Sequence, residues 1–392
     1  MTPAKTQAGR GRGQVEEARG PVAPMVGRDD LRESLSAMLS SGRLPQVLLL
    51  AGPAGCGKQR LAHWLSQLLL CSDLDRAKEP CGECEGCRRV TRFTHPDLLW
   101  YGPHGSPGTG DKSVEFVRDS NSSRAQERTL GLVGSSEPGH AYYVASILAL
   151  REDLALMPAI SSRRVVVMAE VDRLENQAGA TAAANMLLKT LEEPSPSTSF
   201  ILTTSKPHNV LGTIRSRATL LRIPPLPVSV GGEILASAGH RSPDDVRKAF
   251  RQARGDLSRA HQALTRGLPE RDMAKELLNA ILVQDDDYGR SNSILRQGTS
   301  GAKAGFYETL VEALDLTADL LFAASGRDAR VADPEWVQSI QATPGLGSPS
   351  LYARITTLLE QALSEARGNG VPILVAHNLA CGTRQVLGQH DR

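Results

Sequence analysis

The sequence is short of aromatic residues, of net charge and of long apolar runs, and each shortage excludes a class of function. Aromatic residues make up only 4% of the 392 residues, so the chain does not bind single-stranded nucleic acid mainly by stacking bases on aromatic side chains. The 45 Lys and Arg nearly balance the 43 Asp and Glu, which leaves a formal net charge of +2 and no global attraction to nucleic acid or membranes. No apolar run approaches the ~20 residues that a membrane-spanning helix needs.

Cysteine is also scarce, and the N-terminal segment lacks the apolar stretch of a secretory signal. Six cysteines are too few for a disulfide scaffold in a chain of this length. Residues 1–24 contain arginines but little to bury, and their composition predicts a disordered tail. With 40% hydrophobic and 22% charged residues, the remainder can bury a core. These features predict a soluble, cytoplasmic protein.

Short apolar runs alternate with amphipathic segments in the first part of the chain. Three runs are typical of buried parallel strands, at residues 46–51, 164–169 and 200–204. Because the segments between them have helical spacing, the pattern predicts an α/β domain with a parallel sheet over residues 25–225. Residues 105–140 are rich in Gly and Ser and weakly periodic, which predicts a long mobile insertion.

The second part of the chain contains no further strand pattern. Residues 224–227 read PPLP and indicate a hinge. Beyond them every periodic segment has helical spacing, and we divide this helical part near Leu268, into 226–268 and 269–392. The chain length supports two to three domains at about 150 residues each.

A glycine-rich segment follows the first predicted strand and leads into a helix. Residues 52–59 read GPAGCGKQ and fit the phosphate-loop pattern G-x-x-x-x-G-K, except at the last position. The glycines would let backbone N–H groups converge on phosphate oxygens, and Lys58 would neutralise the outer phosphates. Gln59 stands where a Ser or Thr hydroxyl normally binds Mg²⁺. The nucleotide-binding candidates here are Gly52, Gly55, Gly57, Lys58 and Gln59.

A second Mg²⁺ ligand is missing at the end of the strand predicted at 164–169. In a phosphate-loop NTPase an Asp at this place holds the metal, whereas this chain has Ala169. Glu170 follows, either as a water-activating catalytic carboxylate or as a solvated carboxylate at a strand end. Two departures therefore affect the same ion. They leave ATP binding open and predict weak or absent Mg²⁺-dependent hydrolysis.

Four of the six cysteines are close together, at Cys71, Cys81, Cys84 and Cys87. Four thiolates are the ligand number of a closed tetrahedral Zn²⁺ site, which favours structural zinc. An iron–sulfur cluster is the main rival, but the expected C-x3-C-P continuation is absent. Unliganded thiols are the third alternative. The charges in and after this segment are mixed, so it does not indicate a DNA-binding face.

Three further segments make the pattern specific to one family. Residues 184–194 read ANMLLKTLEEP, residues 200–206 read FILTTSK and residues 213–220 read TIRSRATL. Together with a phosphate loop and a four-cysteine module, they resemble the AAA+ clamp-loader subunits of bacterial DNA polymerase III. The resemblance implies an AAA+ domain over 25–225 with a zinc module inserted at 71–87. It also implies a helical lid over 226–268 and a helical collar, which holds the subunits together, over 269–392.

The resemblance also implies roles for single residues. Arg217, in Ser216-Arg217-Ala218, would be an arginine finger that acts on ATP held by a neighbouring subunit. Its alternative role is to satisfy carbonyls near a helix end. Thr203 and Thr204 would form the sensor region at the end of the third predicted strand, or they are simply polar residues at a strand end.

Two subunit types of this family must be distinguished. The gamma/tau type is the motor and has intact nucleotide motifs, whereas these motifs are often degenerate in the delta-prime type. Gln59, Ala169 and the segment THPDL at 94–98 favour delta-prime. This type implies an accessory subunit of the polymerase holoenzyme with little ATPase of its own. Its implied partners are gamma/tau, delta, the sliding clamp and primed DNA.

Three alternatives stay open at this point. The chain could be an ATP-hydrolysing gamma/tau motor, which intact Mg²⁺ ligands at positions 59 and 169 would have favoured. It could be a zinc-containing DNA-binding or repair-associated module on an AAA+ fold, which a basic patch around the cysteines would have favoured. It could also be a stand-alone phosphate-loop enzyme, which steady ATP turnover by the chain alone would reveal.

Overall fold

The computed structural model describes residues 25–73, 79–108, 113–129, 140–174, 180–237, 239, 242–283, 303–343, 345–367 and 370–388. The chain forms two compact units. Unit 1 comprises residues 1–234 together with 255–258, and unit 2 comprises residues 235–254 together with 259–392. The chain therefore passes between the units three times. The tail predicted at residues 1–24 lies outside the described residues.

Unit 1 is built on a sheet of five parallel strands in the spatial order β2-β3-β4-β1-β5. Every residue of β1 and β3 is buried, because both are interior strands that are covered on both faces. The strand β5 lies at one edge of the sheet and is mostly exposed. The strands are β1 Val47–Ala51, β2 Leu98–Tyr101, β3 Arg164–Met168, β4 Thr198–Thr204 and β5 Thr219–Arg222.

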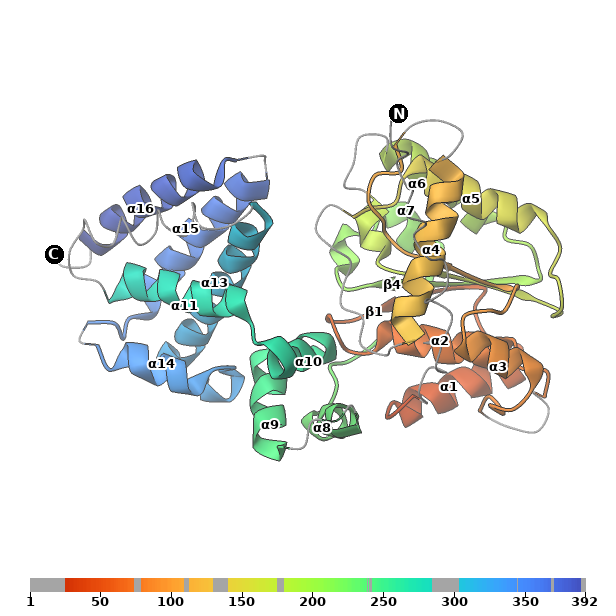
Figure 1. Cartoon of the computed structure of the whole chain (residues 1–392), viewed down its shortest axis with the longest axis horizontal. Helices are drawn as coiled ribbons and strands as arrows, with labels where there is room; N and C mark the ends of the chain where they lie inside the picture. The colour runs from red at the N-terminus through yellow and green to blue at the C-terminus, as the bar shows by residue number, and fades with distance from the viewer. Residues whose placement is uncertain are drawn as a thin grey trace, which may run out of the picture. The chain divides into compact units, whose positions relative to one another are not determined.

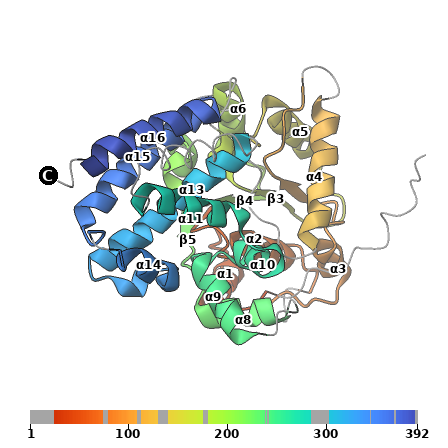
Figure 2. The same ribbon diagram turned by 60° about the vertical axis from the view of Figure 1, so that its left-hand side comes forward.

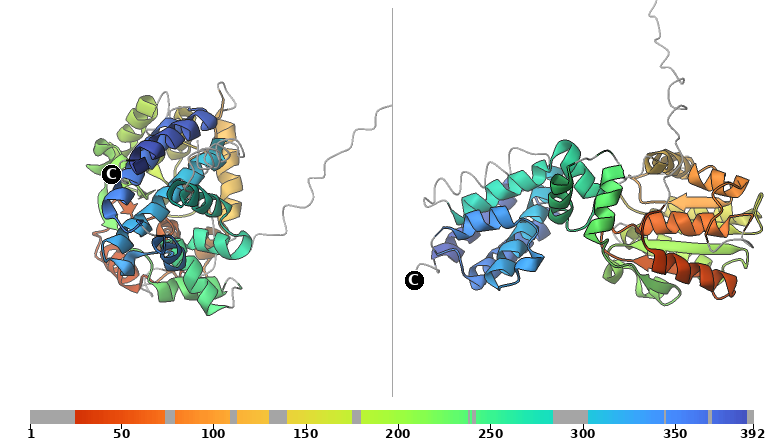
Figure 3. Two further views of the ribbon diagram at one scale, coloured as in Figure 1. Left: turned by 90° about the vertical axis from the view of Figure 1, so that its left-hand side faces the viewer. Right: turned by 90° about the horizontal axis from the view of Figure 1, so that it is seen from below.

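Helices cover both faces of this sheet (Figure 1). Successive residues of β1 point to opposite faces, so Leu50 packs with Leu35 and Leu65 of α1 and α2, while Leu49 packs with Ile147 of α5. The result is a three-layer α/β/α domain, whose layers are seen from below in the right panel of Figure 3. The helices are α1 Asp29–Ser40, α2 Lys58–Leu69, α3 Glu85–Thr91, α4 Ser113–Thr129, α5 Val144–Ala155, α6 Ala180–Glu192, α7 Gly212–Arg215 and α8 Val228–Ser237, with the 3₁₀ turns η2 Val171–Leu174 and η3 Pro207–Asn209.

A helix occupies part of the segment that the sequence predicted as a mobile insertion. Residues 113–129 form α4, and Val117 is fully buried in the apolar cluster with α5 and α6. Arg118 also forms ion pairs with Glu152 at 3.0 Å and with Asp153 at 2.9 Å. The remaining parts of the insertion at 109–112 and 130–139 lie outside the described residues.

Unit 2 is entirely helical in its described part. Its apolar core contains Phe306, Leu316 and Leu320 of α13, Tyr352 of α15 and Val375 of α16. The helices α15 and α16 lie side by side (Figure 2). The elements are α9 Pro243–Gln252, α10 Leu257–Arg266, α11 Pro269–Leu282, α13 Lys303–Ala324, η4 Asp328–Arg330, α14 Pro334–Gln341, α15 Pro349–Arg367 and α16 Pro372–Gly388. No helix in the described residues is long and apolar enough to cross a membrane.

An ionic cluster links the first helices of unit 2 to its apolar bundle. Asp319 is completely buried and accepts from Arg254 at 3.0 Å, while Lys275 pairs with Asp333 at 2.8 Å. Burial raises the pKa of Asp319, and the charge of Arg254 acts against this rise. Because these contacts cross position 268, our division of the helical part near Leu268 stays a prediction. The members of the ionic cluster are Arg254, Arg259, Arg271, Lys275, Glu312, Asp315, Asp319 and Asp333.

Candidate functional site

The phosphate loop connects the end of β1 to the start of α2. Gly57 is the N-cap of α2 with φ +89°, and Gly55 has φ +64°, a backbone region that L side chains rarely adopt. Gly52 has a different reason to be glycine, because an added Cβ would lie 2.3 Å from the carbonyl oxygen of Ile223. The loop thus has the strand–turn–helix geometry that its sequence predicted.

Lys58 is folded back onto the phosphate loop. Its Nζ donates to the carbonyl oxygens of Gly52 at 2.9 Å and Pro53 at 2.6 Å, and the side chain is buried. Burial lowers the pKa of Lys58, whereas the charges of neighbouring groups, Asp256 and Asp172 among them, act in the opposite direction. In this conformation Lys58 therefore donates its hydrogen bonds to the backbone of the loop itself.

The predicted sensor residues Thr203 and Thr204 form hydrogen bonds with the turn that follows β3. The backbone N–H of Glu170 donates to Thr203 Oγ1 at 3.1 Å, and the hydroxyl of Thr204 donates to Asp172 Oδ1 at 2.6 Å. Glu170 itself forms an ion pair with Arg173 at 2.9 Å. The structure thus brings these residues together at the carboxyl ends of β3 and β4. Asp172 was not among the predicted residues, although its position shortly after a buried strand was a usable signal.

Arg217 lies between α7 and β5, and its contacts are local. Its Nη1 donates to the carbonyl oxygen of Thr213 at 3.0 Å and to Ser216 Oγ at 3.3 Å. Its Nη2 forms an ion pair with Glu192 at the end of α6. About a third of the side chain remains exposed. These contacts fit the carbonyl-satisfying role, and they leave part of the guanidinium accessible.

The four predicted metal ligands are brought together between α2 and α3. Cys71 follows the end of α2, Cys84 is the N-cap of α3 and Cys87 lies in its first turn. All four thiol sulfurs lie within 4.8 Å of one another, and three of the separations are 3.6, 3.9 and 3.9 Å. Bonds of ~2.3 Å from one Zn²⁺ to four sulfurs give tetrahedron edges of about 3.8 Å. The donor set therefore fits a single tetrahedral ion.

Backbone N–H groups point at two of the four cysteine sulfurs. The N–H groups of Cys84 and Cys87 donate to the sulfurs of Cys81 and Cys84, each at 3.3 Å. Burial would raise the pKa of Cys84, but hydrogen bonds from Ser72 and Cys87 outweigh it and lower that pKa to about 6. Burial instead raises the pKa of Cys71 and Cys87. A bound cation would reverse this effect.

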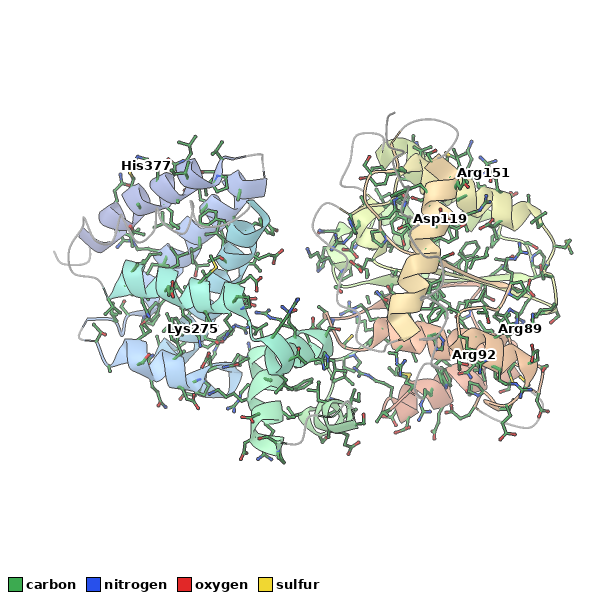
Figure 4. The ribbon with its side chains drawn as sticks, in the orientation of Figure 1. Arg89, Arg92, Asp119, Arg151, Lys275 and His377 are labelled. Atoms are coloured by element: carbon green, nitrogen blue, oxygen red, sulfur yellow. The ribbon has the colours of Figure 1, made fainter. Side chains whose placement is uncertain are left out.

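The basic residues that follow the cysteines are drawn in Figure 4, where Arg89 and Arg92 are labelled. Arg89 forms an ion pair with Glu85 at 2.6 Å within α3. Arg88 lies 4.0 Å from the same carboxylate. Because one acid is shared by two of the arginines, this surface carries mixed charge. It gives no support to a DNA-binding module.

A charged residue that sequence reasoning missed lies in the segment THPDL. Asp97 is fully buried, and its carboxylate accepts from the backbone N–H groups of Ala159 at 2.5 Å, Ile160 at 3.0 Å and Ser161 at 2.8 Å. The loop that it holds connects α5 to β3. We call residues 156–161 the braced loop, and it exposes 80% of Met157.

The sheet, the phosphate loop and the helical second unit define a protein with the AAA+-like α/β fold. A family model described as DNA polymerase III, delta subunit, matches residues 27–227, just over half of the chain, and the chain belongs to this family. The delta-prime subunit of DNA polymerase III from Escherichia coli is 29% identical over 223 residues, which are 57% of this chain and 55% of that protein. The delta-prime subunit of Bacillus subtilis is 28% identical over 188 residues, or 48% and 45% of the two chains.

The gamma/tau type also appears among the relatives. The gamma/tau subunit of Mycobacterium tuberculosis is 31% identical over 195 residues, which are 50% of this chain and 27% of that one. Among solved structures, a gamma subunit-related protein from Thermotoga maritima covers 90% of this chain and 98% of its own, at 14% identity and a TM-score of 0.38. The family match and the delta-prime relatives confirm the resemblance to delta-prime subunits. The chain spans about half the length of the delta-prime relatives that it matches.

Proposed function

We propose that the chain acts as the delta-prime subunit of a clamp loader and assists the ATP-dependent loading of the sliding clamp onto primed DNA. Its proposed partners are gamma/tau and delta in a hetero-oligomer, with the clamp and primed DNA engaged by the whole complex. The observation that carries this proposal is a well-formed phosphate loop beside two missing Mg²⁺ ligands, Gln59 and Ala169. Such a site suits an accessory subunit better than a motor.

The chain's own residues explain why hydrolysis should be weak. Bound Mg²⁺ would neutralise charge on the transferring phosphoryl group. Gln59 puts a longer amide where a short hydroxyl would hold this ion, and Ala169 offers no carboxylate in place of the usual Asp. Glu170, the remaining carboxylate, is engaged with Arg173. Arg217 is the residue that we propose acts in trans, on ATP held by an adjacent subunit.

We also propose that the four cysteines hold one structural Zn²⁺. Four thiolates close the coordination sphere and leave no open position for substrate, so the ion would fasten α2 to α3 and take no part in phosphate chemistry. A four-iron cluster would need its cysteine sulfurs farther apart than a single ion does. The short separations between these sulfurs support zinc.

The experiment that tests the function is reconstitution with purified clamp-loader proteins. The full chain should co-migrate with gamma/tau and delta in size-exclusion chromatography, and its omission should abolish clamp loading. The chain alone should hydrolyse ATP very slowly. Failure to assemble would contradict the proposed function.

A gamma/tau-type motor remains the second candidate, because a gamma/tau relative is as similar as the delta-prime relatives. The same ATPase assay separates the two. Turnover by the isolated chain at a motor's rate, lost in Lys58→Ala, would assign it to the gamma/tau type.

A further inference from the structure

A carboxylate from a distant part of the sequence lies against the phosphate loop. Residues 255–258 comprise the turn before α10 and the first two residues of that helix, and they belong to unit 1. A Cβ added to Gly55 would lie 2.3 Å from Asp256 Oδ1 and 2.4 Å from Asp256 Cα. Asp256 is therefore packed directly onto the glycine whose left-handed backbone shapes the loop.

Asp256 is held in this place by its role in the following helix. Its Oδ1 accepts from the backbone N–H of Ser258 at 2.9 Å, as an N-cap residue of α10 does. The preceding Gly255 has φ +84°, which allows the chain to turn tightly at this point. The carboxylate is thus part of an ordered turn and not the end of a freely rotating side chain.

The cations at the loop are bonded to its own backbone, and carboxylates lie beside them. Besides Lys58, Arg28 donates to the carbonyl oxygen of Cys56 at 2.8 Å. Lys58 is the loop's own cation, and Asp256, Asp172 and Glu170 are the carboxylates that influence it. Arg173 neutralises one of these acids, Glu170. A triphosphate brings several further negative charges, and like charges a few Å apart in a partly buried site repel strongly.

We propose that Asp256 is an internal anion that occupies the mouth of the phosphate loop and determines what the loop binds. The carboxylate takes the place of an external phosphate, so the loop holds the segment 255–258 in the absence of nucleotide and discriminates against nucleoside triphosphates. This inference rests on the proposed function and deepens it. It attributes weak binding of nucleoside triphosphates to one residue, Asp256, in addition to the missing Mg²⁺ ligands.

The test is equilibrium binding of a fluorescent ATP derivative to the full chain. Asp256→Asn keeps an oxygen for the Ser258 N–H and removes the charge, so its affinity should rise on the order of tenfold with or without Mg²⁺. Asp256→Ser, which preserves helix capping, should behave in the same way. The matched control is Asp244→Asn, because Asp244 is an exposed carboxylate in the first turn of α9 and its loss should leave affinity unchanged.

Two further measurements locate the effect. Adding Lys58→Ala to Asp256→Asn should abolish the gained affinity, which places the ligand at the loop. Amide hydrogen exchange at 255–258 should accelerate in Asp256→Asn when the nucleotide is added. Unchanged affinity in both folded Asp256 variants would overturn the proposal. Since these assays use the chain alone, a failure of subunit assembly would contradict the proposed function and leave this inference standing.

Discussion

Arg217 has a local structural role in the chain and a proposed role at a subunit interface. We predict that Arg217→Ala lowers the ATPase and clamp-loading rates of the reconstituted complex severalfold or more, because trans-acting arginines are worth about 10³–10⁵ in rate where one finger acts alone. The ion pair with Glu192 is partly exposed, so its loss should cost less than about 1 kcal/mol. Arg217→Lys should rescue poorly, since an ammonium lacks the planar fork.

Thermal unfolding and complex ATPase should be measured on the same Arg217 variant. A stable variant with slow turnover supports the finger. A destabilised variant whose complexes turn over normally would show that Arg217 serves only α7 and its neighbours.

A second prediction at the scale of one residue concerns Asp97 and the pH dependence of stability. Burial would raise the pKa of this carboxyl, but its bonds from three backbone N–H groups outweigh burial and depress the pKa below its ordinary value. Its stabilising effect is therefore present above the unfolded-state pKa of ~3.9 and is lost as pH falls through the folded-state pKa. Asp97→Asn should lower the free energy of unfolding by about 2–4 kcal/mol at pH 7.

The measurement for Asp97 is urea unfolding of the wild type and the variant from pH 7 down to pH 3. The difference between them should shrink on acidification. A difference that stays constant with pH would mean that the charge of Asp97 does not stabilise the braced loop.

The strands that could be predicted from the sequence are those that have apolar surroundings on both faces of the sheet. The strands β1, β3 and β4 are interior, so each is an apolar run that can be recognised in isolation. The strand β5 could not be recognised in this way, because it lies at an exposed edge. The helix α4 was missed because Val117 is the buried residue among its described side chains, at 113–122, and because Arg118 joins it to α5 by ion pairs.

The candidate site shows the same division. Gly55, Lys58 and the four cysteines lie in short motifs whose chemistry is local, so the sequence alone was enough to propose them as candidates. Asp97 and Asp256 act on backbone far away in the chain, at 159–161 and at Gly55 respectively. No local pattern records such a partner, and only the fold reveals it.

The four-cysteine cluster between α2 and α3 leads to a prediction about secondary structure. Elemental analysis of the purified chain should find about one Zn²⁺ per chain. Chelation, or Cys84→Ser, should lower the thermal midpoint and unravel α3, because this seven-residue helix is too short to be stable by itself. Cys381→Ser is the control, since that cysteine is exposed and is not a member of the four-cysteine cluster. Iron with visible charge-transfer absorbance would refute the zinc assignment.

At the scale of the whole molecule, we expect the ionic cluster to stabilise the helical part against unfolding. Asp319→Ala would remove the fully buried carboxylate that pairs with Arg254, and breaking a buried pair from one side costs about 3–5 kcal/mol. Glu335→Gln is the control, because Glu335 pairs with Lys248 on the surface and should contribute less than about 1 kcal/mol. Denaturant unfolding of both variants provides the comparison. Equal stabilities would show that the cluster does not hold these helices together.

The three crossings of the chain between the two units limit how this protein can be divided, by a protease or by evolution. Cleavage after residue 234 would release a fragment that has the sheet and the metal ligands but lacks residues 255–258, so its phosphate loop would lose Asp256. Cleavage after residue 258 would leave α9 behind without its partners Asp333 and Glu335, at the start of α14. No single cut yields two intact units, so neither unit can be gained or lost whole at one splice point, as a terminally fused module can.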